Sequence, residues 1–301
     1  MSNSKLPVIL LIVLALIWGS SFILIKRALI MYSPTQVACL RMGISFICLL
    51  PISIVQINKI KKKYWPAITA TGFLGNGIPA FLFTTAQVHL SSSVVGVLNS
   101  LVPIFTLLVS TLFFGGKITL LKVGGILLGL IGAFILMSAK QPLGAANGNL
   151  YGLLIVMATI CYAFSVNITK NYLQDISSIG IASLALCIVG PLCLLYLFVF
   201  TDFLQLPLLK ESYLTALGYA ALLSVLGTTL SLFLFNKLVK VSNALYASSV
   251  TYLIPIVALL WGKLDGEPFT IYHFLGMLVI LAGVFISNKK STEIQTVKSS
   301  V

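Results

Sequence analysis

The chain has 301 residues, of which 59% are hydrophobic and only 8% are charged, and its mean hydropathy is +1.09. Soluble domains carry about 25% charged residues, so this chain lacks the polar surface that a water-soluble fold needs. The net charge of +13 does not indicate a nucleic-acid partner. The basic residues stand in short connections between apolar runs, as the orientation signals of membrane proteins do.

Apolar segments long enough to span a bilayer, about 20 residues, follow one another along the whole chain. Backbone in lipid must satisfy its own hydrogen bonds, so these segments can only be helices. The first of them ends without a small-x-small cleavage site, which favours a spanning helix over a signal peptide. The sequence predicts an all-α membrane protein with ten transmembrane helices at 6–28, 35–57, 65–87, 92–114, 120–138, 149–171, 177–200, 213–236, 241–262 and 271–288.

Lysine and arginine set the expected orientation. With the amino terminus in the cytoplasm, 13 of the 19 basic residues fall on the cytoplasmic side, five fall outside, and Arg41 lies within a span. Cytoplasmic loops carry the excess of positive charge. We therefore expect a multi-pass protein of the inner cell membrane with both termini in the cytoplasm.

The two halves of the chain resemble each other in three blocks. Residues 18–26 align with 162–170, residues 101–104 with 253–256, and residues 115–119 with 266–270, at offsets of 144, 152 and 151. We expect a first repeat at 1–145, a second at 146–290 and a cytoplasmic tail at 291–301. Five helices per repeat is an odd number, so the second repeat would be inverted, as in many carriers.

Acidic residues and histidines are absent from the middle of every predicted span. The two histidines lie far apart near helix ends, so neither a metal site nor another cofactor is expected. An enzyme is not expected, and neither is proton coupling through an intramembrane acid. The acidic residues are Asp175, Asp202, Glu211, Asp265, Glu267 and Glu293.

The five cysteines all lie within apolar runs and form no CxxC pair, so we expect small buried side chains rather than disulfides or metal ligands. They are Cys39, Cys48, Cys161, Cys187 and Cys193.

Arg41 is the one formal charge clearly inside a span, about 9 Å deep at 1.5 Å per residue. Its guanidinium fork is suited to capture a substrate carboxylate. The alternative, which the sequence leaves open, is an arginine that reaches back to the interface or clamps backbone carbonyls.

Pro103 and Pro255 fall near the middles of the fourth and ninth predicted helices, at matching positions of the two repeats. Proline removes a backbone donor and displaces a carbonyl, so a kink is expected at each. We interpret the pair as hinges, although proline is also tolerated in ordinary spanning helices.

Other polar and aromatic side chains lie deep within predicted spans, where they face protein or a wet cavity. Hydrogen bonds between helices, worth about 0.6 kcal/mol each, account for part of them. The rings of Trp18 and Tyr162 are also suited to stack on a planar or apolar substrate. The candidate substrate-binding residues are Trp18, Ser21, Arg41, Asn76, Asn99, Tyr162, Asn167 and Tyr252.

The fifth and tenth predicted helices are rich in glycine and poor in polar side chains. Glycines four residues apart, such as Gly125 and Gly129, allow close packing of helices. These two helices are interpreted as scaffold, and they are the expected contact surface of a homodimer.

The motifs resemble those of the EamA-type carriers of the drug/metabolite transporter superfamily. The resemblance covers nearly the whole chain and rests on residues 18–22 with Lys26, the Leu40–Arg41 pair, the two x-x-Pro-Ile blocks and the Gly-Glu267-x-x-Thr270 block. It implies a ten-helix inverted repeat that exports or exchanges small metabolites through a cavity built without the fifth and tenth helices. The chain departs from the pattern at Gly116, where a glutamate is usual.

We therefore expect a secondary transporter, an exporter, of small organic metabolites such as amino acids or related solutes, working by alternating access. The partners expected are the small-molecule substrate and the lipid bilayer. The alternatives are a flippase or exchanger for lipid-linked or nucleotide sugars, and a membrane scaffold that transports nothing.

Overall fold

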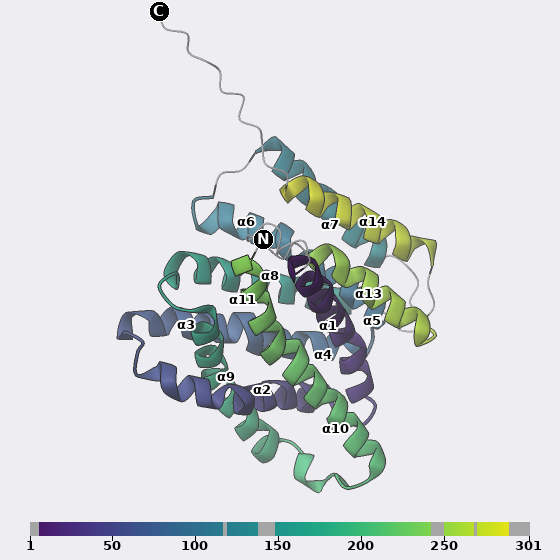
Figure 1. Cartoon of the computed structure of the whole chain (residues 1–301). Helices are drawn as coiled ribbons and strands as arrows, with labels where there is room; N and C mark the ends of the chain where they lie inside the picture. Colours follow the sequence, from purple (N-terminus) through teal and green to yellow (C-terminus); the bar gives the residue numbers. More distant parts are fainter. Residues whose placement is uncertain (1–5, 117–118, 138–147, 242–249, 268–269, 289–301) are drawn as a thin grey trace, which may run out of the picture.

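The computed structural model describes residues 6–116, 119–137, 148–241, 250–267 and 270–288, and every regular element within them is a helix (Figure 1). The predicted tail, residues 291–301, lies outside the described residues. The α-helices are α1 (Leu6–Ala28), α2 (Pro34–Ile57), α3 (Trp65–Gly72), α4 (Ile78–Gln87), α5 (Ser92–Asn99), α6 (Val102–Phe113), α7 (Leu120–Met137), α8 (Gly148–Tyr172), α9 (Ser178–Phe200), α10 (Glu211–Ser224), α11 (Ser231–Val241), α13 (Val250–Leu264) and α14 (Ile271–Asn288).

Seven helical runs are long and apolar enough to cross a membrane: 6–28, 34–57, 62–87, 92–113, 150–172, 178–200 and 211–235. Three shorter apolar helices lie at 120–136, 250–264 and 271–286. The prediction of an all-helical membrane protein is confirmed. The count of ten spans stays a prediction, because three of the apolar helices are shorter than the length needed to cross a bilayer.

Helix α2 shows how the sequence fixes its own helix ends. Ser33 precedes it with extended backbone, its hydroxyl accepts a hydrogen bond from the Gln36 amide, and the Gln36 side chain accepts one from the Ser33 amide at 2.9 Å. This is a capping box. Pro34 occupies the first helical turn, where no amide hydrogen is needed.

The fourth predicted span, 92–114, is two helices instead of one. Helix α5 ends at Asn99, and α6 begins at Val102, with Pro103 in its first turn. A proline there cannot continue the hydrogen-bond ladder of the preceding turn. At the matching position, α13 continues through Pro255, so the two prolines lie in different local structures.

Two further runs contain a π-helical turn. The η2 turn (Phe73–Gly77) joins α3 to α4, and the η4 turn (Val225–Leu230) joins α10 to α11. Their first residues are 152 positions apart, which is also the offset of the two proline blocks. π-Helical turns are rare and are found frequently at functional sites.

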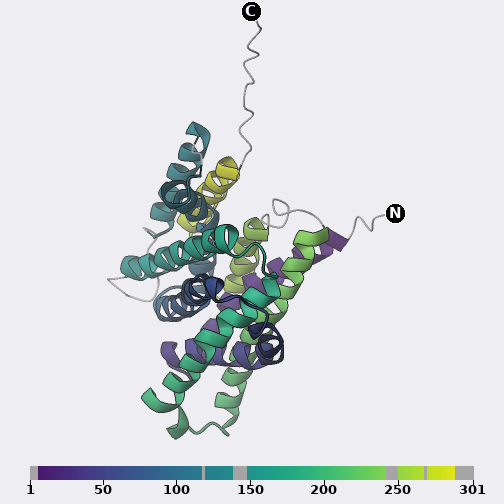
Figure 2. The same ribbon diagram turned by 90° about the vertical axis from the view of Figure 1, so that its left-hand side faces the viewer.

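The helices pack as pairs drawn from the two halves of the chain. Helix α1 lies along α13, α2 along α9, and α7 along α14. Figures 1 and 2 both show α7 and α14 side by side at the edge of the molecule. A Cβ atom at Gly132 or Gly276 would lie within 3.0 Å of the other helix's backbone, so the glycine faces of these helices pack against each other within the chain.

The two ends of the bundle are distinguished by chain direction. Helices α1 and α13 finish at one end, where α5 also begins, while α3 begins at the opposite end (Figure 1). We call the end where α1 finishes the Lys26 end, and the end where α3 begins the Lys63 end.

Candidate substrate site

Arg41 lies on α2 and points its charge toward α8. Its Nε atom is buried without a hydrogen-bond partner, and no ion pair in the described part of the chain includes it. It lies close enough to Tyr162 for its charge to act on the phenol ring. A buried donor without a partner is costly, so the Nε atom of Arg41 has an unmet hydrogen-bond donor within α2.

An aromatic series extends from Tyr162 across the core. The Tyr162 ring lies 6.0 Å from that of Phe83 on α4, and Phe83 lies 6.1 Å from Phe22 on α1, as measured between ring centroids. Such tilted pairs are favourable aromatic contacts. The charge of Arg41 therefore stands at one end of an aromatic series contributed by three helices.

Trp18 connects α1 to the π-helical turn of the second half. Its indole nitrogen donates to the Gly227 carbonyl at 3.2 Å, and its ring lies 5.5 Å from that of Phe235. The Ser21 hydroxyl donates to its own helix at the Ile17 carbonyl. A Cβ atom at Gly227 would lie 3.0 Å from that hydroxyl, so α1 crosses the η4 turn closely.

The first half makes the corresponding contact with α8. A Cβ atom at Gly75, in the η2 turn, would clash with the Ser165 hydroxyl. Gly75 and Gly227 are 152 positions apart, and Ser21 and Ser165 are 144 apart, in agreement with the offsets of the sequence blocks. Each π-helical turn thus crosses the first helix of the other half at a glycine–serine contact.

Asn167 serves as a tether between helices. Its buried amide donates to the Thr106 carbonyl at 3.0 Å and to the Ala163 carbonyl at 2.9 Å. Both donors of the side chain are occupied by α6 and α8 backbone, which favours the interhelical role over substrate contact.

The remaining candidates are spread over the core. Asn76 is half-buried within η2, and Asn99 is half-buried at the last position of α5. Tyr252 packs against the main core from α13. Three hydroxyls outside the candidate set, those of Thr71, Ser100 and Thr228, are buried without a hydrogen-bond partner. Each such group costs about 1–3 kcal/mol.

The Lys26 end carries a cluster of charges that the candidate set does not include. Lys26 Nζ lies 2.5 Å from Asp265 and 2.8 Å from Glu267, and Arg27 also pairs with Asp265. The Glu267 carboxylate further accepts four hydrogen bonds from the start of α5: the amides of Ser92 and Ser93, at 2.9 and 3.1 Å, and their hydroxyls, at 2.5 and 2.6 Å. These six residues are the Glu267 cluster.

Local geometry explains how Glu267 reaches α5. Gly266, with φ +72°, ends α13 in the left-handed conformation that glycine adopts most readily, and the Glu267 amide then donates to the Gly262 carbonyl at 2.8 Å. Any side chain at Gly262 would collide with Ser93 and Glu267. Burial opposes ionisation of Glu267, but the bonds from Lys26 and the two serines outweigh it and lower its pKa to about 2.

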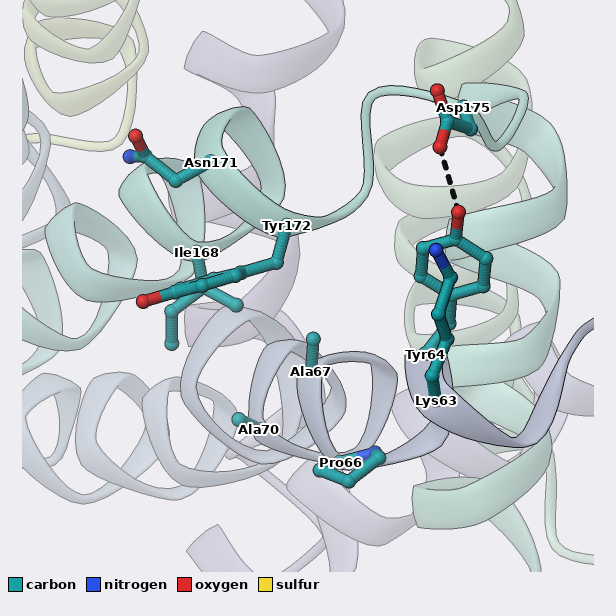
Figure 3. Close-up of a pocket in the computed structure, with 9 residues that line it drawn as sticks. All are labelled: Lys63, Tyr64, Pro66, Ala67, Ala70, Ile168, Asn171, Tyr172 and Asp175. Carbon is teal, nitrogen blue, oxygen red and sulfur yellow. Dashed lines mark hydrogen bonds between the residues drawn. The ribbon is translucent and has the colours of Figure 1, made fainter.

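A cavity of about 610 Å³ opens at the Lys63 end between α3 and α8. Figure 3 shows Tyr172 and Tyr64 on either side of it, with Ala67 between them. The Tyr64 hydroxyl donates to Asp175 at 2.6 Å, and Lys63 Nζ lies 4.7 Å from the centre of the Tyr64 ring. Both signs of charge are therefore present at the rim of this cavity.

Sequence reasoning missed the Glu267 cluster as a unit. Lys26 and Glu267 both belong to the repeated blocks, and this membership could have indicated a shared role. The count of positive charges instead treats Lys26 as a loop residue that sets orientation. A contact between positions 241 residues apart cannot be read from either segment alone.

Comparison with known proteins places the chain in a family. The model of the EamA-like transporter family matches residues 5–138 and again 149–289. A protein of Archaeoglobus fulgidus described as an uncharacterized transporter is 29% identical over 93% of this chain and 98% of its own length. An inner membrane transporter of Escherichia coli K12, YedA, is 28% identical over 92% of this chain and 88% of its own.

A solved crystal structure shares the fold, with a TM-score of 0.62 at 15% identity over 93% of this chain and 95% of that one. With the apolar helices described above, these matches establish what kind of molecule this is. The chain belongs to the EamA-like transporter family and is a multi-pass membrane transporter.

Proposed function

We propose that the protein carries small organic solutes with a carboxylate group, such as amino acids, out of the cell across the inner membrane. The observation that carries this proposal is Arg41: a charged residue within α2, with its Nε atom buried and unpaired, beside Tyr162 of α8. A planar guanidinium binds a carboxylate through two parallel hydrogen bonds. The aromatic series of Tyr162, Phe83 and Phe22 would contact the apolar part of the solute.

A ten-span inverted repeat is part of the proposal. The seven long runs and three shorter apolar helices would together make the ten crossings. The matching π-helical turns and the reciprocal contacts, Gly75 with Ser165 and Gly227 with Ser21, support two halves related by a pseudo-two-fold axis. Such repeats commonly enclose a site near the bilayer midplane and alternate its access between the two sides.

The proposed orientation has both termini in the cytoplasm, as the distribution of lysine and arginine favours. The Lys26 end then faces outward, and the Lys63 end faces the cytoplasm.

The test is flux of a radiolabelled metabolite panel, acids and matched neutral amides, in proteoliposomes that hold the purified protein. We expect transport of at least one carboxylate but not of its amide. Arg41→Ala should reduce that flux at least about tenfold, since one charge-assisted hydrogen bond contributes roughly 1.5–3 kcal/mol. Lys210→Ala, an exposed cation at the start of α10, is the control.

Unchanged flux in Arg41→Ala would remove Arg41 from the site and favour an anchoring role. Failure of folded protein to move any metabolite, together with lipid-linked sugars in the purified sample by mass spectrometry, would favour the flippase alternative.

A further inference from the structure

We infer that the two ends of this carrier are gated differently: the Glu267 cluster closes the Lys26 end, and the α3–α8 cavity is an entrance site for small zwitterionic solutes at the Lys63 end. This inference rests on the proposed transport function but not on the orientation. It follows from comparing each end with its counterpart in the other half of the chain.

The Glu267 cluster holds together three elements that must separate if a path is to open at this end. Lys26 belongs to α1, Ser92 and Ser93 begin α5, and Glu267 follows α13. The Glu267 side chain is only 5% exposed, yet Lys26 and four serine donors satisfy its charge. Removing only some of these partners would leave a buried carboxylate partly unsatisfied, which is costly. We therefore expect α1, α5 and the segment after α13 to separate in one step.

The first half of the chain contains the same turn without the acid. Gly115, the counterpart of Gly266, also has a left-handed backbone, with φ +68°, but the next residue is Gly116. Lys170 is the counterpart of Lys26 in the second repeat. It is exposed, and it takes part in none of the ion pairs among the described residues. The equivalents of Ser92 and Ser93, at 244 and 245, lie outside the described residues and are Ala and Leu in the sequence.

The α3–α8 cavity lies at the Lys63 end, and the positions equivalent to its walls are buried at the Lys26 end. Applying the offsets of 152 and 144, its walls Tyr64 and Tyr172 correspond to Ala216 on α10 and Ala28 on α1. Those alanines are 2% and 0% exposed, and α1 and α10 pack closely at the positions that line the cavity at the other end. Small residues permit that close approach of helices.

Tyr32 completes the closure at the Lys26 end. Its hydroxyl donates to the Tyr213 carbonyl at 3.0 Å, and the two rings lie 5.7 Å apart, edge to face. The tyrosine is only 2% exposed. Ionic and aromatic contacts therefore both hold the helices together at the Lys26 end.

The rim of the cavity indicates what enters. Lys63 offers an ammonium group, and Asp175 keeps one carboxylate oxygen beyond the one that accepts from Tyr64 (Figure 3). A small solute with both charges can pair with the two together, whereas a solute of one sign meets a like charge. Pro66, Ala67 and Ala70 make the floor apolar.

Cysteine accessibility tests this directly, in purified protein where both ends face solvent. Ala67→Cys reports the α3–α8 cavity, and Ala216→Cys reports the sealed end. Peptide mass spectrometry separates them from the five native cysteines. With a water-soluble maleimide we expect Ala67→Cys to react at least about tenfold faster, since a minor open state is populated at roughly 0.1–10%.

Glu267→Gln should then speed labelling of Ala216→Cys and slow that of Ala67→Cys, whereas Glu211→Gln, an exposed acid outside the cluster, should change neither. If Glu267→Gln does not fold, Ser92→Ala with Ser93→Ala removes two donors and keeps the acid. A slower reaction of Ala67→Cys with glycine added, but not with ethanolamine or acetate, would identify the zwitterion site.

Equal labelling of the two positions, or no response to loss of the cluster, overturns the gating assignment. Protection by acetate or ethanolamine equal to that by glycine overturns the zwitterion assignment. Labelling needs no transported solute, so these outcomes are independent of the flux measurement. Normal labelling without carboxylate flux would contradict only the proposed function.

Discussion

The indole nitrogen of Trp18 donates a hydrogen bond to the Gly227 carbonyl, at 3.2 Å, across 209 positions of the chain. A π-helical turn widens the backbone and leaves a carbonyl for an outside donor. The same carbonyl also accepts from Ser231. Trp18 therefore joins the first helix to the one irregular turn in the eighth predicted span, which makes it a structural contact as well as a candidate for the cavity wall.

Trp18→Phe should lower the free energy of unfolding by about 1 kcal/mol, the usual net value of one hydrogen bond. The phenyl ring would keep an aromatic contact with Phe235 but fill less volume than the indole. A loss well beyond about 1 kcal/mol would therefore report packing as well as the bond to Gly227. Thermal unfolding in detergent measures it. An unchanged midpoint would show that the indole nitrogen contributes nothing there. Trp18→Ala should in addition alter the range of transported solutes, and an identical range would exclude Trp18 from the cavity.

Gly276→Ala should destabilise the protein by about 1–3 kcal/mol, because it overpacks the α7–α14 contact. The new methyl group would lie 3.0 Å from the Gly132 carbonyl and 2.9 Å from Leu136 Cβ. Gly124→Ala, where no atom lies within 4 Å of the new group, is the matched control. It should be neutral or stabilise by up to about 1 kcal/mol through helix propensity. Equal effects of the two substitutions would contradict the backbone-to-backbone packing.

Cys39 on α2 and Cys193 on α9 are both buried free thiols on two helices that lie along each other, and they are close enough to interact. We expect a membrane-permeant oxidant to join them and a reductant to release them. If α2 and α9 move against each other during transport, the cross-link should abolish flux reversibly. Cys193→Ser is the control and should be insensitive to the oxidant. A cross-linked protein at full activity would show that this helix pair moves as one body.

The contribution of Glu267 to stability should depend on pH. Its pKa is lowered from 4.5 to about 2 in the fold, so its ionised form is favoured by folding. That stability is fully present above about pH 4.5 and is lost as the pH falls toward 2. The difference in thermal midpoint between the unsubstituted protein and Glu267→Gln should therefore shrink over this range. A difference that stays constant from pH 7 to pH 3 would contradict the ionised, hydrogen-bonded carboxylate.

Local chemistry settled much of this protein before any tertiary contact was known. Runs of apolar residues require helices because lipid offers no partner to the backbone, and Ser33 with Gln36 fixes the start of α2 within its own turn. The family followed from short blocks such as the one around Trp18, and Arg41 stood out because one charge within an apolar span is unusual. These signals lie within a few residues, so the sequence alone carries them.

Contacts between distant segments decided the rest. Asn167 and Trp18 look alike as polar groups within spans, yet one holds the Thr106 carbonyl and the other the Gly227 carbonyl. The π-helical turns and the Glu267 cluster have no local periodicity that distinguishes them from an ordinary helix and an ordinary loop. The hydrogen bond from Lys26 of α1 to Glu267, which lies beyond the end of α13, forms only once packing brings the two together. Its energy depends on a distance that hydropathy does not encode.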